Sequence, residues 1–487
     1  MLSRYTVPMS DPHETLRQTL TPLLDQTVDA ALDYLSASNT RSVAATTPLA
    51  TLRQRLDLPL ANDPLDPEQV IDDLITGVEG GLHDSTGPRF FGWVIGGSLP
   101  AALAADWLTS TWDQNAGLYA TSPASAVVEE IAGRWLKELL HLPAEASFSF
   151  TTGCQMAHIN TLTVARHAVL ARHGWNVPQQ GLFGAPPIRV LTSTERHETT
   201  MRALRFLGIG EQNIHALPVD DAGRLIPSAL QSALEAEPNR PTIVVLQAGD
   251  VNIGAFDDFT TLIPLARAHH AWVHIDGAMG LWANATPRLQ HLLLGVEQAD
   301  SWATDGHKWL NVPYDSGYAF VADATIHRAA LAQGDAPYLT NSTAARDQLP
   351  YNLEFSRRAR AYPTYAAIRQ LGRSGIADLI DRCCRHCHTL TTRIGALPHA
   401  QLLAEPIINQ GLVRFLSPTS NATEADHNAF TDQTIAAINH SGEAFFGPTT
   451  WRGKRAMRIS VSNWQTTDHD IDRVVAAIAK ILQSSAA

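Results

Sequence analysis

The sequence predicts an α/β fold, in which helices cover both faces of a mostly parallel sheet, with a helical arm before it and a small α+β domain after it. Short runs of β-branched and aromatic residues alternate with helical stretches over the middle of the chain. Strands separated by helices pair in parallel, because each helix carries the chain back to the same end of the sheet. The 487 residues exceed what one hydrophobic core usually organises, which predicts two or three regions.

The first region, residues 1–85, has helical patterns only. Apolar side chains recur at helical spacing over residues 15–35, and Asp66-Pro67-Glu68 has the form of a capped helix start. We expect this region to form an arm outside the catalytic part of the protein.

The second region, residues 86–375, carries the alternation of helices and strands. Helices are predicted over residues 126–140 and 161–172. Strands are predicted over residues 147–150, 188–191, 242–246 and 272–275. Short strands between helices indicate a parallel sheet that is buried on both faces, so we expect one large domain here.

The third region, residues 376–487, has a different pattern. A long helix is predicted over residues 376–395, followed by strands near 411–415 and 456–461 and an amphipathic helix near 468–482. Strands and helices that do not alternate are typical of a smaller α+β domain.

The overall charge argues against a nucleic-acid or anionic-membrane surface. The chain has 48 acidic and 36 basic residues, a formal net charge of −12, and such surfaces require basic patches. Its longest apolar stretch, residues 90–105, is short for a membrane span, and residues 1–20 lack the apolar core of a secretory signal. We therefore expect a small-molecule partner and a cytoplasmic location.

The four cysteines are Cys154 and a crowded group of Cys383, Cys384 and Cys387. This distribution is poor for a disulfide framework and favours a reducing compartment. The group with its two neighbouring histidines has the composition of a metal site, but no second ligand pair of matching spacing follows it. We expect buried thiols and no metal.

A carboxylate, Asp276, follows a predicted buried strand in His274-Ile275-Asp276-Gly277-Ala278. Ligands bind at such strand ends in open α/β sheets. A carboxylate there has two interpretations, a partner for the ring nitrogen of pyridoxal phosphate or a turn-forming aspartate before glycine.

A lysine with aromatic and apolar neighbours, Lys308, lies in Gly306-His307-Lys308-Trp309-Leu310. Burial disfavours the ammonium form, so we expect a lowered pKa and an amine that forms imines readily. The alternative is a lysine whose stem crosses an apolar surface while its charged end stays in water.

A strand, a small-residue turn and a helix follow one another at Phe150, Gly153-Cys154-Gln155 and Met156. Backbone N–H groups at such a helix start bind phosphate, with help from the helix dipole. Tight strand-to-helix turns also use glycine without any ligand, so the turn alone leaves both interpretations open.

Taken together, these motifs resemble the group II pyridoxal-phosphate-dependent amino-acid decarboxylases, which include the aromatic amino-acid and glutamate decarboxylases. The resemblance covers residues 88–373, and the joint order of the motifs is specific. It implies fold type I, with a sheet of the seven-stranded type. The further motifs that carry it are Pro88-Arg89-Phe90-Phe91, Thr121-Ser122-Pro123-Ala124, His197 and the run of residues 249–257.

The resemblance also implies a role for each matching residue toward pyridoxal 5′-phosphate. Lys308 would form the Schiff base, with His307 beside it, and Asp276 would pair with the ring nitrogen. His197 would stack on one face of the ring and Ala278 would pack on the other. The phosphate would be bound by Gly153, Cys154 and Gln155. Asp305 stands where related enzymes often have asparagine, and we leave it out because a carboxylate repels phosphate.

Three further residues are implied for the reaction itself. Tyr338 resembles the mobile-loop tyrosine that protonates the substrate carbon after carbon dioxide leaves, and its alternative is a packed loop tyrosine. Arg357 matches an arginine that binds the substrate carboxylate or orders the site. Trp93 offers an aromatic wall, although residues 91–97 depart from the pattern of the aromatic decarboxylases.

The function implied is decarboxylation of an L-amino acid to its amine and carbon dioxide. An aromatic substrate is favoured, and an acidic or aliphatic one stays open. A decarboxylation-dependent aldehyde synthase and an aminotransferase are the alternatives on the same fold, and the tyrosine at 338 argues against the former. The resemblance further implies a homodimer.

Overall fold

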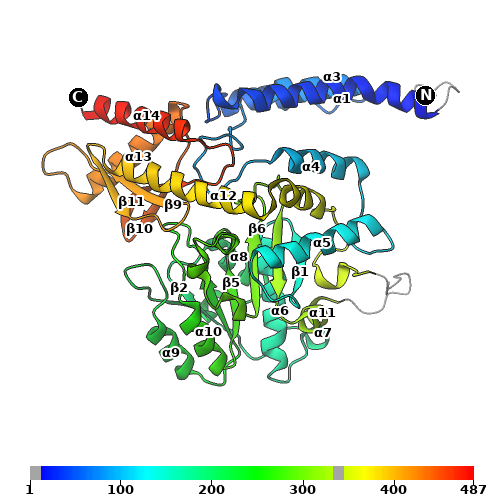
Figure 1. Ribbon diagram of the computed structural model, residues 1–487, viewed down its shortest axis with the longest axis vertical. Coiled ribbons are helices and arrows are strands. Elements are labelled where there is room, and N and C mark those ends of the chain that lie inside the picture. Colours follow the sequence, from blue (N-terminus) through cyan, green and yellow to red (C-terminus); the bar gives the residue numbers. More distant parts are fainter. Residues whose placement is uncertain (1–11, 333–344, 487) are drawn as a thin grey trace.

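The structure is a computed structural model that describes residues 12–332 and 345–486. Its large part is a seven-stranded sheet with helices on both faces, and its small part is a four-stranded sheet beside which the C-terminal helices lie (Figure 1). No helix in these two ranges is long and apolar enough to cross a membrane.

The large sheet has the strand order β1-β7-β6-β5-β4-β2-β3. All pairs are parallel except those of β7, which runs antiparallel to both β1 and β6. Its strands are β1 (Ser147–Thr151), β2 (Arg189–Ser193), β3 (Ile214–Leu217), β4 (Thr242–Gln247), β5 (Trp272–Asp276), β6 (Ser301–Asp305) and β7 (Gly317–Val321). The predicted α/β class, mostly parallel, is therefore confirmed.

Alternate residues of the central strands pack against helices on opposite faces. Ile243 and Val245 contact one cluster, which also holds residues of α6 and α8. Val244 and Leu246 belong to the other, with residues of α5, α9 and α10. The helices of this part are α4 (Pro100–Trp112), α5 (Pro123–Leu139), α6 (Cys154–Ala171), α7 (Val177–Gln180), α8 (Glu198–Phe206), α9 (Pro227–Ala236), α10 (Phe259–Ala268) and α11 (Ala324–Leu331).

The small sheet is antiparallel, with the order β10-β11-β9-β8. Its strands are β8 (Ala400–Ala404), β9 (Gln410–Phe415), β10 (Gly447–Trp451) and β11 (Lys454–Ser460), and its helices are α12 (Ala361–Gly395), α13 (Glu424–His440) and α14 (Asp468–Ala486). Helix α12 starts within the large part and bends at Gly372, whose φ is 61°. The predicted boundary at 375 therefore lies three residues after this bend, where two helical segments meet.

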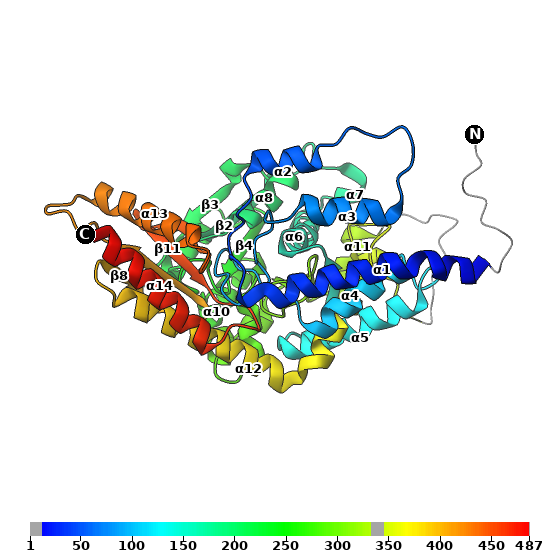
Figure 2. The ribbon, with the colours of Figure 1, turned by 90° about the horizontal axis from the view of Figure 1, so that it is seen from above.

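The N-terminal arm consists of α1 (Pro12–Ser36), α2 (Leu49–Leu56) and α3 (Pro67–Gly77). Helices α1 and α3 lie side by side (Figure 2), and Figure 1 shows them apart from the large sheet. Asp66 caps α3 by accepting the N–H of Glu68, as the sequence pattern predicts. Short 3-10 turns occur at Ala37–Asn39, Glu211–Asn213, Gly280–Ala285, Gln290–Leu293, Val296–Gln298 and Leu349–Tyr351.

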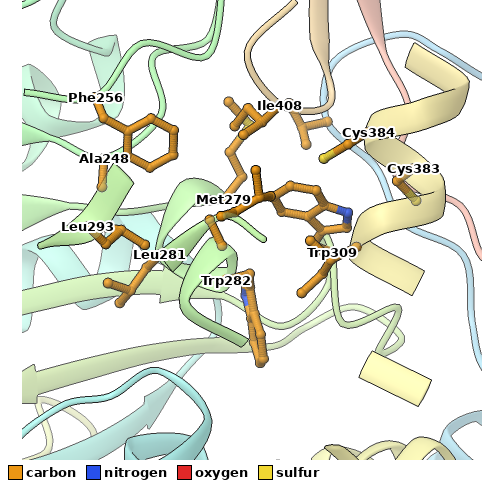
Figure 3. Close-up of a cluster of buried hydrophobic side chains, with 14 of the residues drawn as sticks. Ala248, Phe256, Met279, Leu281, Trp282, Leu293, Trp309, Cys383, Cys384 and Ile408 are labelled. Carbon is orange, nitrogen blue, oxygen red and sulfur yellow. The ribbon is translucent and has the colours of Figure 1, made fainter. Parts of the chain in front are cut away.

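A buried apolar cluster that includes Trp309, the residue after Lys308, joins the large sheet to α12. Trp309 packs in this cluster with Met279 and Ile408, and Cys383 and Cys384 reach it from α12 (Figure 3). Trp309 is 1% exposed, so the residue that follows Lys308 is anchored in the core. This packing fixes the backbone that carries the lysine.

Candidate active site

A cavity of about 450 Å³ opens at the edge of the large sheet where the parallel strands end. The register of the strands explains which residues reach this edge. Gln247 at the end of β4 pairs with Asp276 at the end of β5, and Asp305 at the end of β6 pairs with Gly317 at the start of β7. Residues far apart in the sequence therefore meet at one edge of the sheet.

Nine of the predicted site residues line this cavity together. They are Trp93, Gly153, Cys154, Gln155, His197, Asp276, Ala278, His307 and Lys308. They come from the segment before α4, the start of α6, the residue before α8, the end of β5 and the loop after β6. The structure thus brings together residues that span more than two hundred positions of sequence.

The carboxylate of Asp276 is buried and hydrogen-bonded. Oδ2 accepts the hydroxyl of Thr200 at 2.9 Å, and Oδ1 lies 3.5 Å from His158 Nε2. Burial alone would raise the pKa of Asp276, but the nearby His158, His197 and Thr200 lower it well below its ordinary value. Asp276 is therefore held as an anion.

Behind Asp276, two buried histidines form a hydrogen-bond chain. His158 Nδ1 lies 2.9 Å from His274 Nε2, and His274 Nδ1 lies 2.9 Å from Ser301 Oγ. Trp272 Nε1 donates to the same Ser301 oxygen at 2.9 Å. The anionic Asp276 can only accept, so His158 presents its Nε2–H to it. Ser301 Oγ has two acceptor lone pairs, so it can take the indole N–H and still bond His274. Burial keeps the pKa of His274 well below its ordinary value, so this histidine is neutral.

His197 occupies the N-cap position of α8. Its Nδ1 accepts the backbone N–H of Thr199 at 3.2 Å and lies 2.7 Å from the hydroxyl of that residue. Burial lowers its pKa. The cap fixes the ring, because Nδ1 is held by the helix start while the rest of the ring lines the cavity.

Lys308 is paired with Asp305. Its Nζ lies 2.9 Å from Asp305 Oδ2. Burial would lower the pKa of Lys308, but Asp305 outweighs burial, and the pKa is raised above its ordinary value. The expectation of a lowered lysine pKa is therefore wrong, because the sequence did not show that a carboxylate three residues earlier would face the amine.

The turn before α6 fits closely against β7. A Cβ on Gly317 would lie 2.4 Å from Gly153 Cα, so only glycine allows this approach. The backbone N–H of Cys154, the first residue of α6, points to the cavity edge and donates to Asp305 Oδ1 at 2.5 Å. Burial raises the pKa of the Cys154 thiol well above its ordinary value, which keeps it neutral.

Three polar groups of the cavity wall have no partner among the residues that the structure describes. Gln247 Nε2 and His307 Nδ1 are buried without a hydrogen bond. The guanidinium of Arg458 lines the cavity with neither a hydrogen bond nor an ion pair to any described side chain. Buried donors without partners are costly, so this wall suits an anionic ligand with several acceptors. Pyridoxal phosphate with an amino acid has this chemistry.

Two other predicted residues are not among those that line the cavity. Arg357 does not line the cavity, because it forms a buried ion pair with Glu129 at 2.7 Å and donates to the carbonyls of Ala116 and Phe150. Its predicted role, to bind the substrate carboxylate or to order the site, therefore stays a prediction, and the ion pair is in keeping with the second of these. Tyr338 lies outside the described residues.

Sequence reasoning missed the cavity residues Arg458, Gln247 and Tyr314. Arg458 belongs to β11 of the small domain, and no local motif marks it. Gln247 is the last residue of a predicted strand, and this position at a strand end is what could have marked it as a site residue. Tyr314 stacks on His307, with ring centroids 4.2 Å apart.

The thiols of Cys383, Cys384 and Cys387 are buried in the core on α12. Burial raises the pKa of Cys383 and of Cys387 to about 12. Metal binding needs thiolates, so this environment favours the buried-thiol interpretation.

Comparison with known proteins agrees with this geometry. The family described as "Pyridoxal-dependent decarboxylase conserved domain" matches residues 49–416. An aromatic-L-amino-acid decarboxylase of Bacillus atrophaeus is 24% identical over 464 residues, 94% of each chain. An L-2,4-diaminobutyrate decarboxylase of Rhizobium meliloti is 29% identical over 389 residues, 78% of this chain and 74% of that protein.

Among solved structures, Oryza sativa TDC with PLP and tryptamine superimposes with a TM-score of 0.90 at 22% identity, covering 99% of this chain and 100% of that one. This likeness confirms the fold. The family match covers most of the sequence and includes every cavity residue named above except Arg458. The chain belongs to the pyridoxal-dependent decarboxylase family and is a pyridoxal-phosphate-dependent amino-acid decarboxylase.

Proposed function

We propose that this chain decarboxylates an aromatic L-amino acid to its amine in the cavity of about 450 Å³, with Lys308 as the point of cofactor attachment. The observation that carries the proposal is the position of Lys308 and Asp276 in the wall of one cavity at the ends of β6 and β5. When bound, the cofactor supplies an electron sink for the electron pair released as the bond from Cα to the carboxylate breaks.

Several residues would hold the cofactor. The buried Asp276 anion would keep the ring nitrogen protonated, and the histidine chain behind it would hold Asp276 in that charge state. His197, fixed by its N-cap hydrogen bonds, and Ala278 would lie against the ring. The turn of Gly153, Cys154 and Gln155 would bind the phosphate at the start of α6.

Arg458 would orient the substrate. Its guanidinium faces the cavity without a partner and suits a carboxylate bidentately. Holding the α-carboxylate in one position would set the angle of the bond that breaks, which is the main contribution a protein can make to this step. Tyr338 would then deliver a proton to Cα, in keeping with the sequence resemblance.

The aromatic preference is supported by a stack of rings at the cavity mouth. Trp93 lines the cavity, and its ring centroid lies 5.3 Å from that of Phe445 and 5.9 Å from that of Phe90. Offset aromatic stacks of this kind add a further ring readily. The relative from Bacillus atrophaeus carries the same substrate class in its name.

A second candidate is an acidic substrate. It is favoured by Arg458, because an unpaired guanidinium in a cavity wall can bind a side-chain carboxylate as well as an α-carboxylate. The two candidates differ in what the pocket must bind, so substrate competition separates them.

Release of carbon dioxide across a panel of L-amino acids tests the proposal. We expect an aromatic amino acid to have the highest kcat/KM, with the amine as product. An acidic amino acid as the best substrate would overturn the aromatic preference. Aldehyde with ammonia and peroxide would indicate the aldehyde synthase, and keto-acid-dependent conversion without carbon dioxide would indicate an aminotransferase.

The same assay tests the role of Arg458. We expect Arg458→Met to lower kcat/KM by about tenfold to a hundredfold, the effect of removing a hydrogen bond to a charged group. Arg455→Met is the matched control, because Arg455 lies on the same strand and pairs with Asp432 outside the cavity. Equal effects of the two variants would contradict the assignment.

The protein would act as a homodimer in the cytoplasm. Helix α1 exposes a stripe of leucines at helical spacing on the side that the rest of the chain leaves uncovered, and a second copy would cover it. Its members are Leu16, Leu20, Leu24, Val28, Leu32 and Leu35. The four free thiols support a reducing compartment.

A further inference from the structure

Asp305 contacts the same protein groups to which we assign cofactor binding. Its Oδ1 accepts the N–H of Cys154 at 2.5 Å, and its Oδ2 lies 2.9 Å from Lys308 Nζ. His307 Nε2 lies 3.4 Å from Oδ1. The side chain is 2% exposed, so it is enclosed within the site and not at its rim.

Asp305 contacts both groups that this edge of the sheet offers to an anion. Helix α6 has 18 residues, and its N-terminus favours a negative charge. Asp305 supplies that charge and at the same time neutralises Lys308. A phosphate bound at the same helix start would be a second anion next to a buried carboxylate, which low polarity makes unfavourable.

Attachment of the cofactor also changes the group that faces Asp305, because the amine of Lys308 no longer offers three N–H donors. Lys308 Nζ ceases to be a free ammonium group when it becomes the attachment point. The other titratable groups around Asp305 supply no positive charge. Burial lowers the pKa of His307 and raises those of Cys154, Tyr314 and Tyr318, so these groups are neutral, and Asp276 is itself an anion.

We infer that Asp305 binds the phosphorylated cofactor in its protonated form, so that loading the site takes up one proton. The inference rests on the proposed cofactor site. A protonated carboxyl group has an O–H that donates to a phosphate oxygen, whereas a carboxylate has no donor. Asparagine at this position donates without taking up a proton. This chain therefore retains its cofactor less well as the pH rises, and an asparagine would remove that dependence.

The test compares pyridoxal 5′-phosphate with pyridoxal on the full chain freed of cofactor. Both compounds react with Lys308 through the same aldehyde, so their difference isolates the phosphate. Calorimetry in buffers of different ionisation enthalpy measures the protons taken up on binding. We expect the phosphate-dependent uptake to be about one proton greater in the wild type than in Asp305→Asn.

The affinities should follow the same rule. Relative to Asp305→Asn, the wild type should bind pyridoxal 5′-phosphate about tenfold more weakly for each unit of rising pH, as expected for one linked proton. Pyridoxal should show no such difference. Asp305→Ser, which retains a hydroxyl donor, should behave like the asparagine variant. Asp300→Asn is the matched control, because Asp300 is a partly buried carboxylate that accepts a backbone N–H, at the opposite end of β6.

Two outcomes would overturn the inference at different levels. Equal proton uptake and equal pH dependence in the wild type and Asp305→Asn would show that Asp305 does not share a proton with the phosphate, while the cofactor site would stand. Equal affinity of every variant for pyridoxal and its phosphate would show that no phosphate binds at this edge, and the proposed site itself would fail.

Discussion

At the scale of single residues, the charge of Asp276 depends on side chains that never touch the cavity. His158 contacts Asp276, His274 holds His158, and Ser301 holds His274. A sequence shows each of these residues, but it does not show that they adjoin, because they come from α6, β5 and β6. This explains why Asp276 alone was singled out from the sequence.

Replacing His158 by leucine tests this chain of hydrogen bonds. We expect the free energy of unfolding of the cofactor-free protein to fall by about 1–3 kcal/mol, because His274 and Asp276 each lose a buried partner. The absorbance of the bound cofactor should also become sensitive to pH. His158→Asn, which can still donate, should preserve the spectrum. His167→Leu is the control on the same helix, because the buried His167 Nδ1 has no hydrogen bond. An unchanged spectrum in His158→Leu would contradict the account.

The buried His327 makes the free energy of unfolding depend on pH. His327 is buried between Ser147 Oγ at 2.7 Å and Asn160 Oδ1 at 3.0 Å, and burial, with a contribution from Arg346, lowers its pKa to about 3. The unfolded chain takes up this proton near the ordinary histidine pKa, and the folded chain does not. The stabilisation is therefore complete above that value and is lost as the pH falls toward 3.

We expect His327 to account for a loss of about 2 kcal/mol in the free energy of unfolding between about pH 7 and pH 5. His327→Gln should flatten this slope in urea titrations at the two pH values. The exposed His291→Gln should leave it unchanged. A slope equal to that of the wild type in His327→Gln would contradict the predicted pKa.

At the scale of elements, strands are predictable where their apolar pattern is strong. The four strands expected in the large sheet are found within one or two residues of their predicted bounds. β3, β6 and β7 were not predicted. β3 is short and partly exposed, and β6 carries the mixed sequence Ser-Trp-Ala-Thr-Asp. Tertiary pairing, and not local pattern, makes these segments strands.

The contact between β7 and the turn before α6 makes a prediction at this scale. Gly317→Ala places a Cβ against the backbone of Gly153, so we expect the turn to shift, with a loss of about 1–3 kcal/mol in stability and weaker cofactor binding. Thermal unfolding and cofactor titration measure the two effects. Gly447→Ala is the control, because a Cβ on this strand glycine would meet nothing within 4 Å. Equal behaviour of the two variants would contradict the tight contact.

At the scale of the whole molecule, the arm is the part that the single chain leaves most exposed. Leu16 and Leu32 of α1 are each 58% exposed, and a cavity of about 610 Å³ lies between α1, α3 and the segment that joins the arm to the large part. An exposed leucine stripe on a helix that extends from the body is typical of an interface between subunits.

We expect Leu16→Glu combined with Leu32→Glu to shift the sedimenting species from dimer to monomer, because two charges would be buried without partners in the interface. Phe183→Glu is the control, since Phe183 is an apolar side chain that is 99% exposed and lies outside the arm. A dimer that survives the double substitution would contradict the role of this face. Analytical ultracentrifugation measures the outcome.

The candidate site was predictable to the extent that its motifs follow strand ends. Such motifs meet at one edge of a parallel sheet, so Asp276, Lys308 and Gly153 were found from the sequence. Arg458 was missed because it reaches the cavity from the other domain, and the ion pair of Arg357 was missed because its partner, Glu129, is more than two hundred residues away. Contacts between distant segments are what the sequence pattern leaves out.

The central claim is that Lys308 carries the cofactor, and chemical trapping tests it most directly. The chain has four lysines, Lys137, Lys308, Lys454 and Lys480, and of these only Lys308 lines the described cavity. Borohydride reduction of the holoenzyme fixes the cofactor to its lysine, and peptide mass spectrometry locates it. We predict the added mass on the peptide that contains Lys308 and on no other. The same mass on Lys137, Lys454 or Lys480, with Lys308 unmodified, would contradict the account.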